Sequence, residues 1–364
     1  MNYKCSKCNK IYNTNIKTAV CSCGGLLDLE YDIPDFSRDK IDSSIWNMFR
    51  YRNFMPVEDD SWKKVTLGEG MTPIIRLDDS VFLKMDYYMP TLSFKDRGAA
   101  MLVSHCKSIG VKKVVQDSSG NAGNSIAAYC ARAGIDCEIF VPEGTSSGKI
   151  KMIAAHGAKI NIIEGNREDC ANACRKKVFE EGIYYASHVY NPFFYEGTKT
   201  YIYEVFEQLG YIPSNIFIPL GNGTLFFGII KGLEHLMKSG VINSFPHIVA
   251  VQSERCAPIY EAVKQGLTTF APVNSYPTLA EGIAIAEPMR HAEILALIYK
   301  YNIEIISVPE SRILPAQKLL SSKGIFCEPT TAATFAGYTE YCDIIGKIDD
   351  VLIPVCGAGI KSEH

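Results

Sequence analysis

The sequence has no long hydrophobic run and no excess of charge of either sign. No stretch of its 364 residues reaches the roughly 18 apolar residues that a membrane-spanning helix needs. Its 37 basic and 40 acidic residues are interspersed and give a formal net charge of -3, which predicts no binding to nucleic acid or to an anionic membrane. The first eight residues, Met-Asn-Tyr-Lys-Cys-Ser-Lys-Cys, lack the apolar segment of a secretion signal. We therefore expect a soluble, cytoplasmic protein whose partner is a small molecule.

A disulfide framework is also not expected. The thirteen cysteines are an odd number, and most stand singly within apolar segments, as Cys106, Cys130 and Cys137 do. A thiol in such a segment behaves as a small hydrophobic side chain. This pattern is typical of a protein that stays in a reducing compartment.

Four cysteines near the start are arranged differently. They form two local pairs, Cys5 with Cys8 and Cys21 with Cys23, and a strand-like segment follows at 26–31. Four thiolates are the number that a structural zinc site uses, although the second pair is Cys-x-Cys and not the usual Cys-x2-Cys. Residues 1–32 are therefore predicted to form a zinc-ribbon-like unit, with a metal-free arm as the alternative. The polar and aromatic stretch 33–66 is expected to be a connecting arm on the surface of another domain or subunit.

The rest of the chain alternates between strand-like and helical patterns. Short apolar runs rich in β-branched residues lie at 81–85, 113–116, 137–141 and 159–163, and again at 215–219, 247–252, 303–308 and 351–354. Alternation of this kind predicts an α/β fold with two parallel-sheet domains. We expect a small α/β domain at 83–182 and a large one formed by 67–82 and 183–364.

In open α/β sheets, ligands bind beyond the carboxyl ends of the strands, so the loops there are the first places to look. Residues 93–98 (Ser-Phe-Lys-Asp-Arg-Gly) open a predicted helix with Lys95 in its first turn. The helix dipole disfavours a cation there, and partial burial would add to this by favouring the neutral amine that a nucleophilic lysine needs. Taken alone, Lys95 is better explained as a solvated surface lysine in the first turn of a helix.

Three further loops carry polar groups. The segment 117–123 (Asp-Ser-Ser-Gly-Asn-Ala-Gly) precedes an Ala-rich helix and offers a cradle for a carboxylate, or simply a helix cap. The segment 220–224 (Leu-Gly-Asn-Gly-Thr) suits a phosphate at a helix N-terminus, but it lacks the third glycine of a dinucleotide-binding fingerprint. Cys356 follows the last predicted strand. None of these loops identifies a function by itself.

Taken together and in this order, these segments resemble the tryptophan-synthase-β superfamily of pyridoxal-phosphate enzymes (fold type II), and within it the threonine synthases. Residues 67–73 (Leu-Gly-Glu-Gly-Met-Thr-Pro) look like that family's opening turn, 93–98 like its lysine motif, and 328–333 (Glu-Pro-Thr-Thr-Ala-Ala) like its late helix start. The similarity covers most of the chain. It implies a fold type II enzyme that eliminates or replaces a group on a small amino acid.

The resemblance also implies a role for each loop. Lys95 would hold pyridoxal 5'-phosphate as an imine and later remove the α-proton of the substrate. Asn121 would bind the ring hydroxyl oxygen, and Cys356 would lie beside the ring nitrogen, where a thiol makes the ring a weaker electron sink than an aspartate would. The cofactor phosphate would be bound by Gly221, Asn222, Gly223 and Thr224. The substrate carboxylate would be bound by Ser118, Ser119 and Asn121.

The substrate is less well defined, because a threonine synthase must also bind the phosphate of O-phosphohomoserine. Where the family tends to place a hydroxyl and an arginine for this purpose, the sequence has Ala122 and Phe194. Glu281 stands in an Ala-Glu-Gly segment similar to that of serine and threonine dehydratases.

Three hypotheses remain open at this point. The first is a threonine synthase whose phosphate contacts are rearranged, with Lys84, Lys199, Ser187 and Thr198 as substitutes. The second is a dehydratase-like lyase or a β-replacement synthase that acts on a non-phosphorylated amino acid. The third is a non-catalytic nucleotide- or zinc-binding protein. The family and the arm at 33–66 suggest a homodimer.

Overall fold

The computed structural model describes residues 1–16 and 20–361, and the chain divides into two compact units. The first unit comprises Met1–Met71, Met89–Thr91 and Lys95–Thr200. The second comprises Thr72–Tyr88, Leu92–Phe94 and the described part of Tyr201–His364. Among the described residues, no helix is both long enough and apolar enough to cross a membrane.

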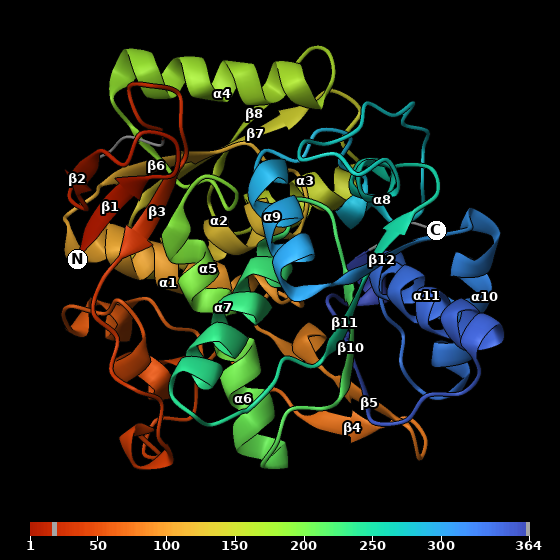
Figure 1. Cartoon of the computed structure of the whole chain (residues 1–364). Coiled ribbons are helices and arrows are strands. Elements are labelled where there is room, and N and C mark those ends of the chain that lie inside the picture. Colours follow the sequence, from red (N-terminus) through yellow and green to blue (C-terminus); the bar gives the residue numbers. More distant parts are fainter. Residues whose placement is uncertain (17–19, 362–364) are drawn as a thin grey trace. The chain divides into compact units, whose positions relative to one another are not determined.

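The first unit begins with a small antiparallel sheet of order β2-β1-β3, coloured red in Figure 1. Its strands are β1 (Asn2–Cys5), β2 (Ile11–Asn13) and β3 (Leu27–Glu30). The following arm contains three short 3-10 helices, Arg38–Lys40, Met48–Phe54 and Asp60–Lys64. Phe49 of the arm is fully buried and stacks on Trp62, with ring centroids 4.9 Å apart, so this stretch is packed and not a loose linker.

A four-stranded parallel sheet of order β8-β7-β6-β9 forms the centre of the first unit. Its strands are β6 (Lys113–Gln116), β7 (Asp136–Pro142), β8 (Lys159–Ile163) and β9 (Tyr184–Tyr185). The helices of the unit are α1 (Lys95–Ser108), α2 (Asn121–Ala133), α3 (Ser147–Ala154), α4 (Arg167–Glu181) and α5 (Pro192–Thr198). Local sequence fixes two of their ends: Gly134 terminates α2 with φ +64°, and Asn166 and Asp169 form a capping box at the start of α4.

The second unit is built on a six-stranded sheet of order β12-β11-β10-β13-β5-β4, parallel except for the edge strand β4. Its strands are β4 (Ile74–Arg76), β5 (Val81–Lys84), β10 (Asn215–Pro219), β11 (His247–Ser253), β12 (Glu304–Val308) and β13 (Val351–Pro354). The residues of β13 are all buried, as expected for a central parallel strand with a continuous apolar run.

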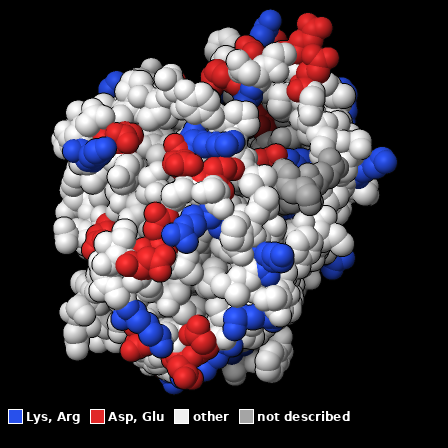
Figure 2. Space-filling model, turned by 90° about the vertical axis from the view of Figure 1, so that its right-hand side faces the viewer, with Lys and Arg blue, Asp and Glu red and all other residues white. Residues whose placement is uncertain are grey.

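Helices α7 (Thr224–Lys238), α8 (Pro258–Lys264), α9 (His291–Tyr301), α10 (Glu310–Ser322) and α11 (Pro329–Ile345) complete the second unit, and α6 (Thr200–Leu209) starts at the last residue of the first. Apolar residues of the sheet and of α11, among them Val251, Ala332 and Val351, form a shared core. On the face drawn in Figure 2, basic and acidic side chains are interspersed.

The α/β architecture with parallel sheets is therefore confirmed. One strand differs in its partners from the grouping that the sequence suggested. The domain limits drawn from the sequence divide the run at 81–85 between the two domains, after residue 82, whereas the whole of β5 pairs in parallel with β13, more than 260 residues later in the chain. Pairing between such distant segments leaves no local signal in the sequence. The domain limits drawn from the sequence stay a prediction.

Candidate functional site

Lys95 is the first residue of α1, and the start of this helix is held firmly in place. The neighbouring Asp96 is fully buried and accepts hydrogen bonds from the backbone N–H and the hydroxyl of Thr91, at 2.7 and 2.5 Å. The hydroxyl of Ser125, on α2, donates to the same carboxylate. Asp96 thus ties the helix that carries Lys95 to α2, a role that the sequence analysis did not assign to it.

The amine of Lys95 lies against an aromatic ring. Its Nζ is 5.9 Å from the ring centroid of Phe194, and the lysine is half-buried. The ring of Phe194 packs so closely on Gly98, one turn further along α1, that a Cβ at position 98 would overlap it. A glycine at this place is therefore required for Phe194 to reach Lys95.

His188 is a further residue in contact with Phe194, and the sequence analysis missed it. Its ring contacts that of Phe194 edge to face, with centroids 5.9 Å apart, and its Nδ1 lies 3.4 Å from Nε2 of Gln116, the last residue of β6. Burial, together with the charges of Lys95 and Arg167, holds the pKa of His188 well below its ordinary value. His188 is therefore a neutral hydrogen-bonding group. No pattern in the sequence pointed to it.

The predicted carboxylate cradle is the loop from β6 to α2. The backbone N–H of Gly120 donates to Oγ of Ser118 at 3.3 Å, and Asn121 is the first residue of the helix. A Cβ at Gly123 would overlap the carbonyl of Ser118, so the loop closes on itself only with glycine there. The preceding Asp117 accepts a hydrogen bond of 2.8 Å from the hydroxyl of Tyr185 on β9, which attaches the start of the loop to the sheet.

The predicted phosphate loop lies in the second unit, between β10 and α7. Gly223 caps α7 with φ +79°, a conformation that favours glycine. A Cβ at Gly221 would lie 3.0 Å from Cα of Ile283 and 3.1 Å from the carbonyl oxygen of Gly282. Residues 221–224 therefore lie directly beside the short 3-10 helix Glu281–Ile283. Within the second unit the structure thus places Gly221 beside the segment that begins with Glu281, and Glu281 itself is exposed.

Cys356 is fully buried in the loop that follows β13. Its N–H donates 2.9 Å to Oγ1 of Thr331 on α11, and its carbonyl accepts a hydrogen bond of 2.9 Å from the N–H of Phe94. Ser93 forms a β-bridge with Gly357. The two residues that precede Lys95 in the chain are therefore bound to the Cys356 loop.

The substitutes that were considered for a second phosphate site are engaged elsewhere. Lys84 is fully buried and forms an ion pair of 2.8 Å with Glu204. Lys199 forms a buried ion pair with Glu196. The hydroxyl of Ser187 lies 3.3 Å from the N–H of Val189, and that of Thr198 donates to a carbonyl of its own helix. Ala122 and Phe194 are buried and offer no hydrogen-bonding side chain.

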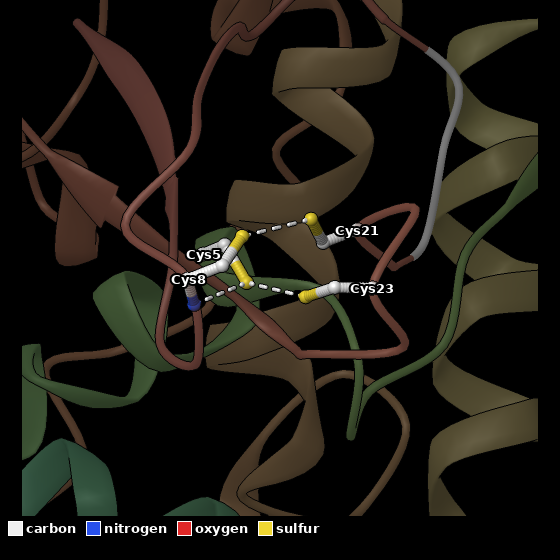
Figure 3. A group of neighbouring side chains, drawn as sticks. All are labelled: Cys5, Cys8, Cys21 and Cys23. Carbon is white, nitrogen blue, oxygen red and sulfur yellow. Dashed lines mark hydrogen bonds between the residues drawn. The ribbon is translucent and has the colours of Figure 1, made fainter.

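The four N-terminal cysteines form one cluster (Figure 3), and all four sulfurs lie within 4.8 Å of one another. The Cys5–Cys23 and Cys8–Cys21 sulfur pairs are each 3.5 Å apart. Four sulfurs at about 2.3 Å from a tetrahedral zinc ion would be roughly 3.8 Å apart, so the cluster has the size of a zinc site.

The surroundings of the four sulfurs act on the thiols in opposite directions. The backbone N–H of Cys23 and then the hydroxyl of Tyr12, 3.0 Å from the sulfur, lower the pKa of Cys21 to about 5. The backbone N–H of Lys10 lowers the pKa of Cys8, but the other three sulfurs outweigh it and raise this pKa to about 12. A Cβ at Gly25 would lie 2.6 Å from the sulfur of Cys5, so the turn beside the cluster requires glycine.

The family described as "Pyridoxal-phosphate dependent enzyme" matches residues 65–357 of the chain. The threonine synthase of Methanocaldococcus jannaschii is 32% identical, and the match covers 98% of this chain and 92% of that one. The threonine synthase of Mycobacterium leprae is 33% identical over 85% of this chain and 87% of its own.

The fold is similar to that of a solved structure, the processed form of threonine deaminase isoform 2 from Solanum lycopersicum. The TM-score is 0.71 at 20% sequence identity, and the match covers 92% of this chain and 93% of the other. At this identity the comparison supports the fold alone.

Proposed function

Because the chain belongs to the family of pyridoxal-phosphate-dependent enzymes and is threonine synthase-like, we propose that Lys95 binds the cofactor covalently and acts as the base of the reaction. The observation that carries this proposal is the position of Lys95. It is the first residue of α1, half-buried, 5.9 Å from the ring of Phe194 and on a helix start held by Asp96. A half-buried amine on a helix start that Asp96 fixes is held in one place, as a group that binds a cofactor and takes a proton must be.

The residues of the second unit fit the cofactor. The loop 221–224 offers backbone N–H groups at the start of α7, and the left-handed Gly223 keeps them unobstructed. We assign the cofactor phosphate to Gly221, Asn222, Gly223 and Thr224 and the ring nitrogen to Cys356; the ring hydroxyl we assign to Asn121, a residue of the first unit. A further buried atom fits a ligand here: the hydroxyl oxygen of Ser93 has no hydrogen-bond partner among the described residues.

When it is bound, pyridoxal phosphate supplies a ring that withdraws electrons from the Cα of an amino acid. The chain's own residues then have separate tasks. Ser118, Ser119 and Asn121 bind the α-carboxylate at the N-terminus of α2, and the amine of Lys95 takes the α-proton. Cys356 meets the ring nitrogen with a thiol, which brings no negative charge to hold a proton there.

As the substrate we propose O-phosphohomoserine, converted to threonine and phosphate, because the full-length relatives are named threonine synthases. A second candidate is a dehydratase-like β-elimination, or a β-replacement, on a non-phosphorylated amino acid. The observation that favours it is the apolar character of Ala122 and Phe194, together with the engagement of Lys84 and Lys199 by carboxylates. In either case Ala122, Phe194 and Glu281 are the residues that we assign to the substrate side chain.

The test begins with purified protein loaded with pyridoxal phosphate. O-phosphohomoserine is added and released phosphate is measured, while serine and threonine are assayed in parallel for keto acid. Phosphate release with threonine as the product supports the first candidate, and keto acid without phosphate release supports the second. Lys95→Ala should abolish both reactions, whereas Lys107→Ala on the same helix should leave them intact. A protein that gains no visible absorbance with the cofactor would remove the proposal altogether.

For the cluster of Cys5, Cys8, Cys21 and Cys23 we propose a structural Zn²⁺ that completes a zinc-ribbon-like unit. The spacing of the four sulfurs supports it. A unit of about 32 residues buries too little apolar surface to fold without such a crosslink. We also propose a cytoplasmic homodimer with a small amino acid as its substrate. Metal analysis and light scattering on the purified protein test the two assignments.

A further inference from the structure

Helix α5 (Pro192–Thr198) is the element that joins the four-cysteine unit to the surroundings of Lys95. It has seven residues, all of them buried, and Asn191 caps it by accepting a hydrogen bond from the N–H of Phe193 at 3.0 Å. Its two sides meet different parts of the first unit. One side contacts the N-terminal segment and His105 near the end of α1, and the other contacts the first turn of α1.

Two aromatic contacts connect α5 with the N-terminal segment. The ring of Phe193 meets that of Tyr3 on β1 edge to face, with centroids 6.0 Å apart. On its other side Phe193 stacks on His105 of α1, with centroids 3.7 Å apart and ring planes 12° apart. Nε2 of His105 lies 3.1 Å from the carbonyl oxygen of Thr14, so His105 also reaches the N-terminal segment. Tyr3 is only two residues before Cys5.

A buried polar cluster makes the second connection. The hydroxyl of Tyr31, which follows β3, donates to Oε2 of Glu196 at 2.6 Å. Nζ of Lys199 donates to this hydroxyl at 2.7 Å and to the carbonyl of Phe54 at 3.0 Å, and it forms the ion pair with Glu196. Buried charges of this kind hold a fixed geometry because each lost contact leaves a desolvated charge. Tyr31 therefore fixes the end of α5 to the last strand of the N-terminal sheet.

The opposite side of α5 faces the catalytic lysine. Phe194 packs on Gly98 and lies 5.9 Å from Nζ of Lys95. Gly197, one turn later, lies so close to the carbonyl of Arg97 that a Cβ there would overlap it. Residues 193 and 194 are adjacent in the chain, so a shift of Phe193 on one side moves Phe194 on the other.

We propose that Tyr31, Glu196 and Lys199 are positioning residues through which the metal-bound four-cysteine unit holds Phe194 against Lys95. The inference rests on the proposed function of Lys95 and of the cysteines. When the metal is removed, the small sheet β2-β1-β3 loses its crosslink, and Tyr3 and Tyr31 no longer support α5. The ring of Phe194 then moves away from Lys95. The reactivity of the lysine therefore changes, although no residue near it has been substituted.

The experiment uses the full-length protein loaded with pyridoxal phosphate and compares three samples. These are the untreated enzyme, the enzyme treated with a zinc chelator, and the Tyr31→Phe variant. Three quantities are measured: metal content, turnover, and the visible absorbance of the bound cofactor as a function of pH. The matched control is Tyr211→Phe, which removes another tyrosine hydroxyl that is bound to a carboxylate, 2.8 Å from Asp350 in the second unit.

The proposal predicts one metal ion per chain in the untreated enzyme. After chelation, turnover falls at least tenfold, and the midpoint of the absorbance titration shifts by at least half a pH unit while the cofactor stays bound. Tyr31→Phe gives the same direction of shift, at least threefold lower turnover and unchanged metal content. Tyr211→Phe changes none of the three quantities.

Other outcomes overturn the proposal. They are chelated enzyme whose titration midpoint and turnover are unchanged, or Tyr31→Phe that behaves like Tyr211→Phe. Untreated protein that contains no metal also overturns it. If the untreated protein fails to bind pyridoxal phosphate at all, then the proposed function itself is wrong, and this failure is visible before any metal is removed.

Discussion

The backbone N–H of Phe94 donates a hydrogen bond of 2.9 Å to the carbonyl oxygen of Cys356. Phe94 directly precedes Lys95, and Ser93 bridges to Gly357, so the strand-like residues before the lysine run along the loop that follows β13. Two segments that are far apart in the sequence, and that the family resemblance assigned to one cofactor, are therefore bound to each other by main-chain contacts.

Ser93 gives a first prediction, because its buried hydroxyl has no hydrogen-bond partner among the described residues. A buried, unsatisfied polar group destabilises the fold, so Ser93→Ala should stabilise the cofactor-free protein by about 1 kcal/mol. If the hydroxyl meets the cofactor, the same change should weaken binding of pyridoxal phosphate roughly fivefold, the equivalent of one hydrogen bond. Thermal unfolding and a cofactor titration check the two effects.

The control Ser104→Ala removes a buried hydroxyl that is bound to the carbonyl of Ala100 at 2.7 Å, and it should destabilise the protein. A Ser93→Ala protein that behaves like this control would contradict the account.

The phosphate loop gives a second prediction through a pair of glycines. Gly223 and Gly240 both have positive φ, +79° and +69°, at the two ends of α7. Alanine at either position should cost about 1–2 kcal/mol of unfolding free energy. Only Gly223→Ala should also weaken binding of pyridoxal phosphate, by roughly tenfold or more, because only Gly223 belongs to the loop that we assign to the cofactor phosphate. Equal cofactor affinities in the two variants would remove this assignment.

Lys84 gives a third prediction, which separates a structural role from substrate binding. Lys84→Met leaves Glu204 buried without its partner and should cost about 3–5 kcal/mol of stability. The double variant Lys84→Met with Glu204→Leu should regain most of this loss, because it removes both charges. The KM for O-phosphohomoserine should be unchanged in the double variant. A large rise in KM would show that Lys84 binds the substrate phosphate after all.

His105 gives a prediction about pH. Burial lowers its pKa from 6.5 to about 4 in the folded protein. Above pH 6.5 the residue is neutral in both the folded and the unfolded states. Between pH 6.5 and pH 4 the unfolded state binds the extra proton, so stability falls as the pH is lowered. The difference of about 2.5 units corresponds to at most about 3 kcal/mol.

The measurement is the unfolding free energy of wild type and of His105→Gln across this pH range. Glutamine keeps a donor for the carbonyl of Thr14 but does not titrate. The wild type should lose up to about 3 kcal/mol more than the variant between pH 6.5 and pH 4. Parallel curves for the two proteins would show that His105 does not titrate as described.

The sequence predicted the elements and the loops well, for a physical reason. Continuous apolar runs such as 351–354 and glycine-rich turns such as 220–224 carry their structure locally, and both are found where they were expected. What the sequence did not predict was contact between distant segments. The pairing of β5 with β13 and the capture of Lys84 by Glu204 depend on residues more than a hundred positions away.

The same limit applies to the surroundings of Lys95. In the sequence, Phe194 was noted only because it stands where the family tends to have an arginine. The structure shows that its ring packs on Gly98 and lies near the amine of Lys95. His188 and Asp96 were overlooked, because a single histidine or aspartate has no pattern until its neighbours are known. Prediction from sequence therefore reached the family and its chemistry, but not the residues that hold Lys95 in place.

The central claim is that Lys95 forms the covalent bond to pyridoxal phosphate, and reductive trapping tests it most directly. The loaded protein is reduced with borohydride and digested, and the masses of its peptides are measured by mass spectrometry. The account predicts that the mass of reduced pyridoxal phosphate is attached to the peptide that contains Lys95, and that Lys95→Arg protein carries none. An adduct on another lysine of the wild type, or the absence of any adduct in protein that has visibly bound the cofactor, would contradict it.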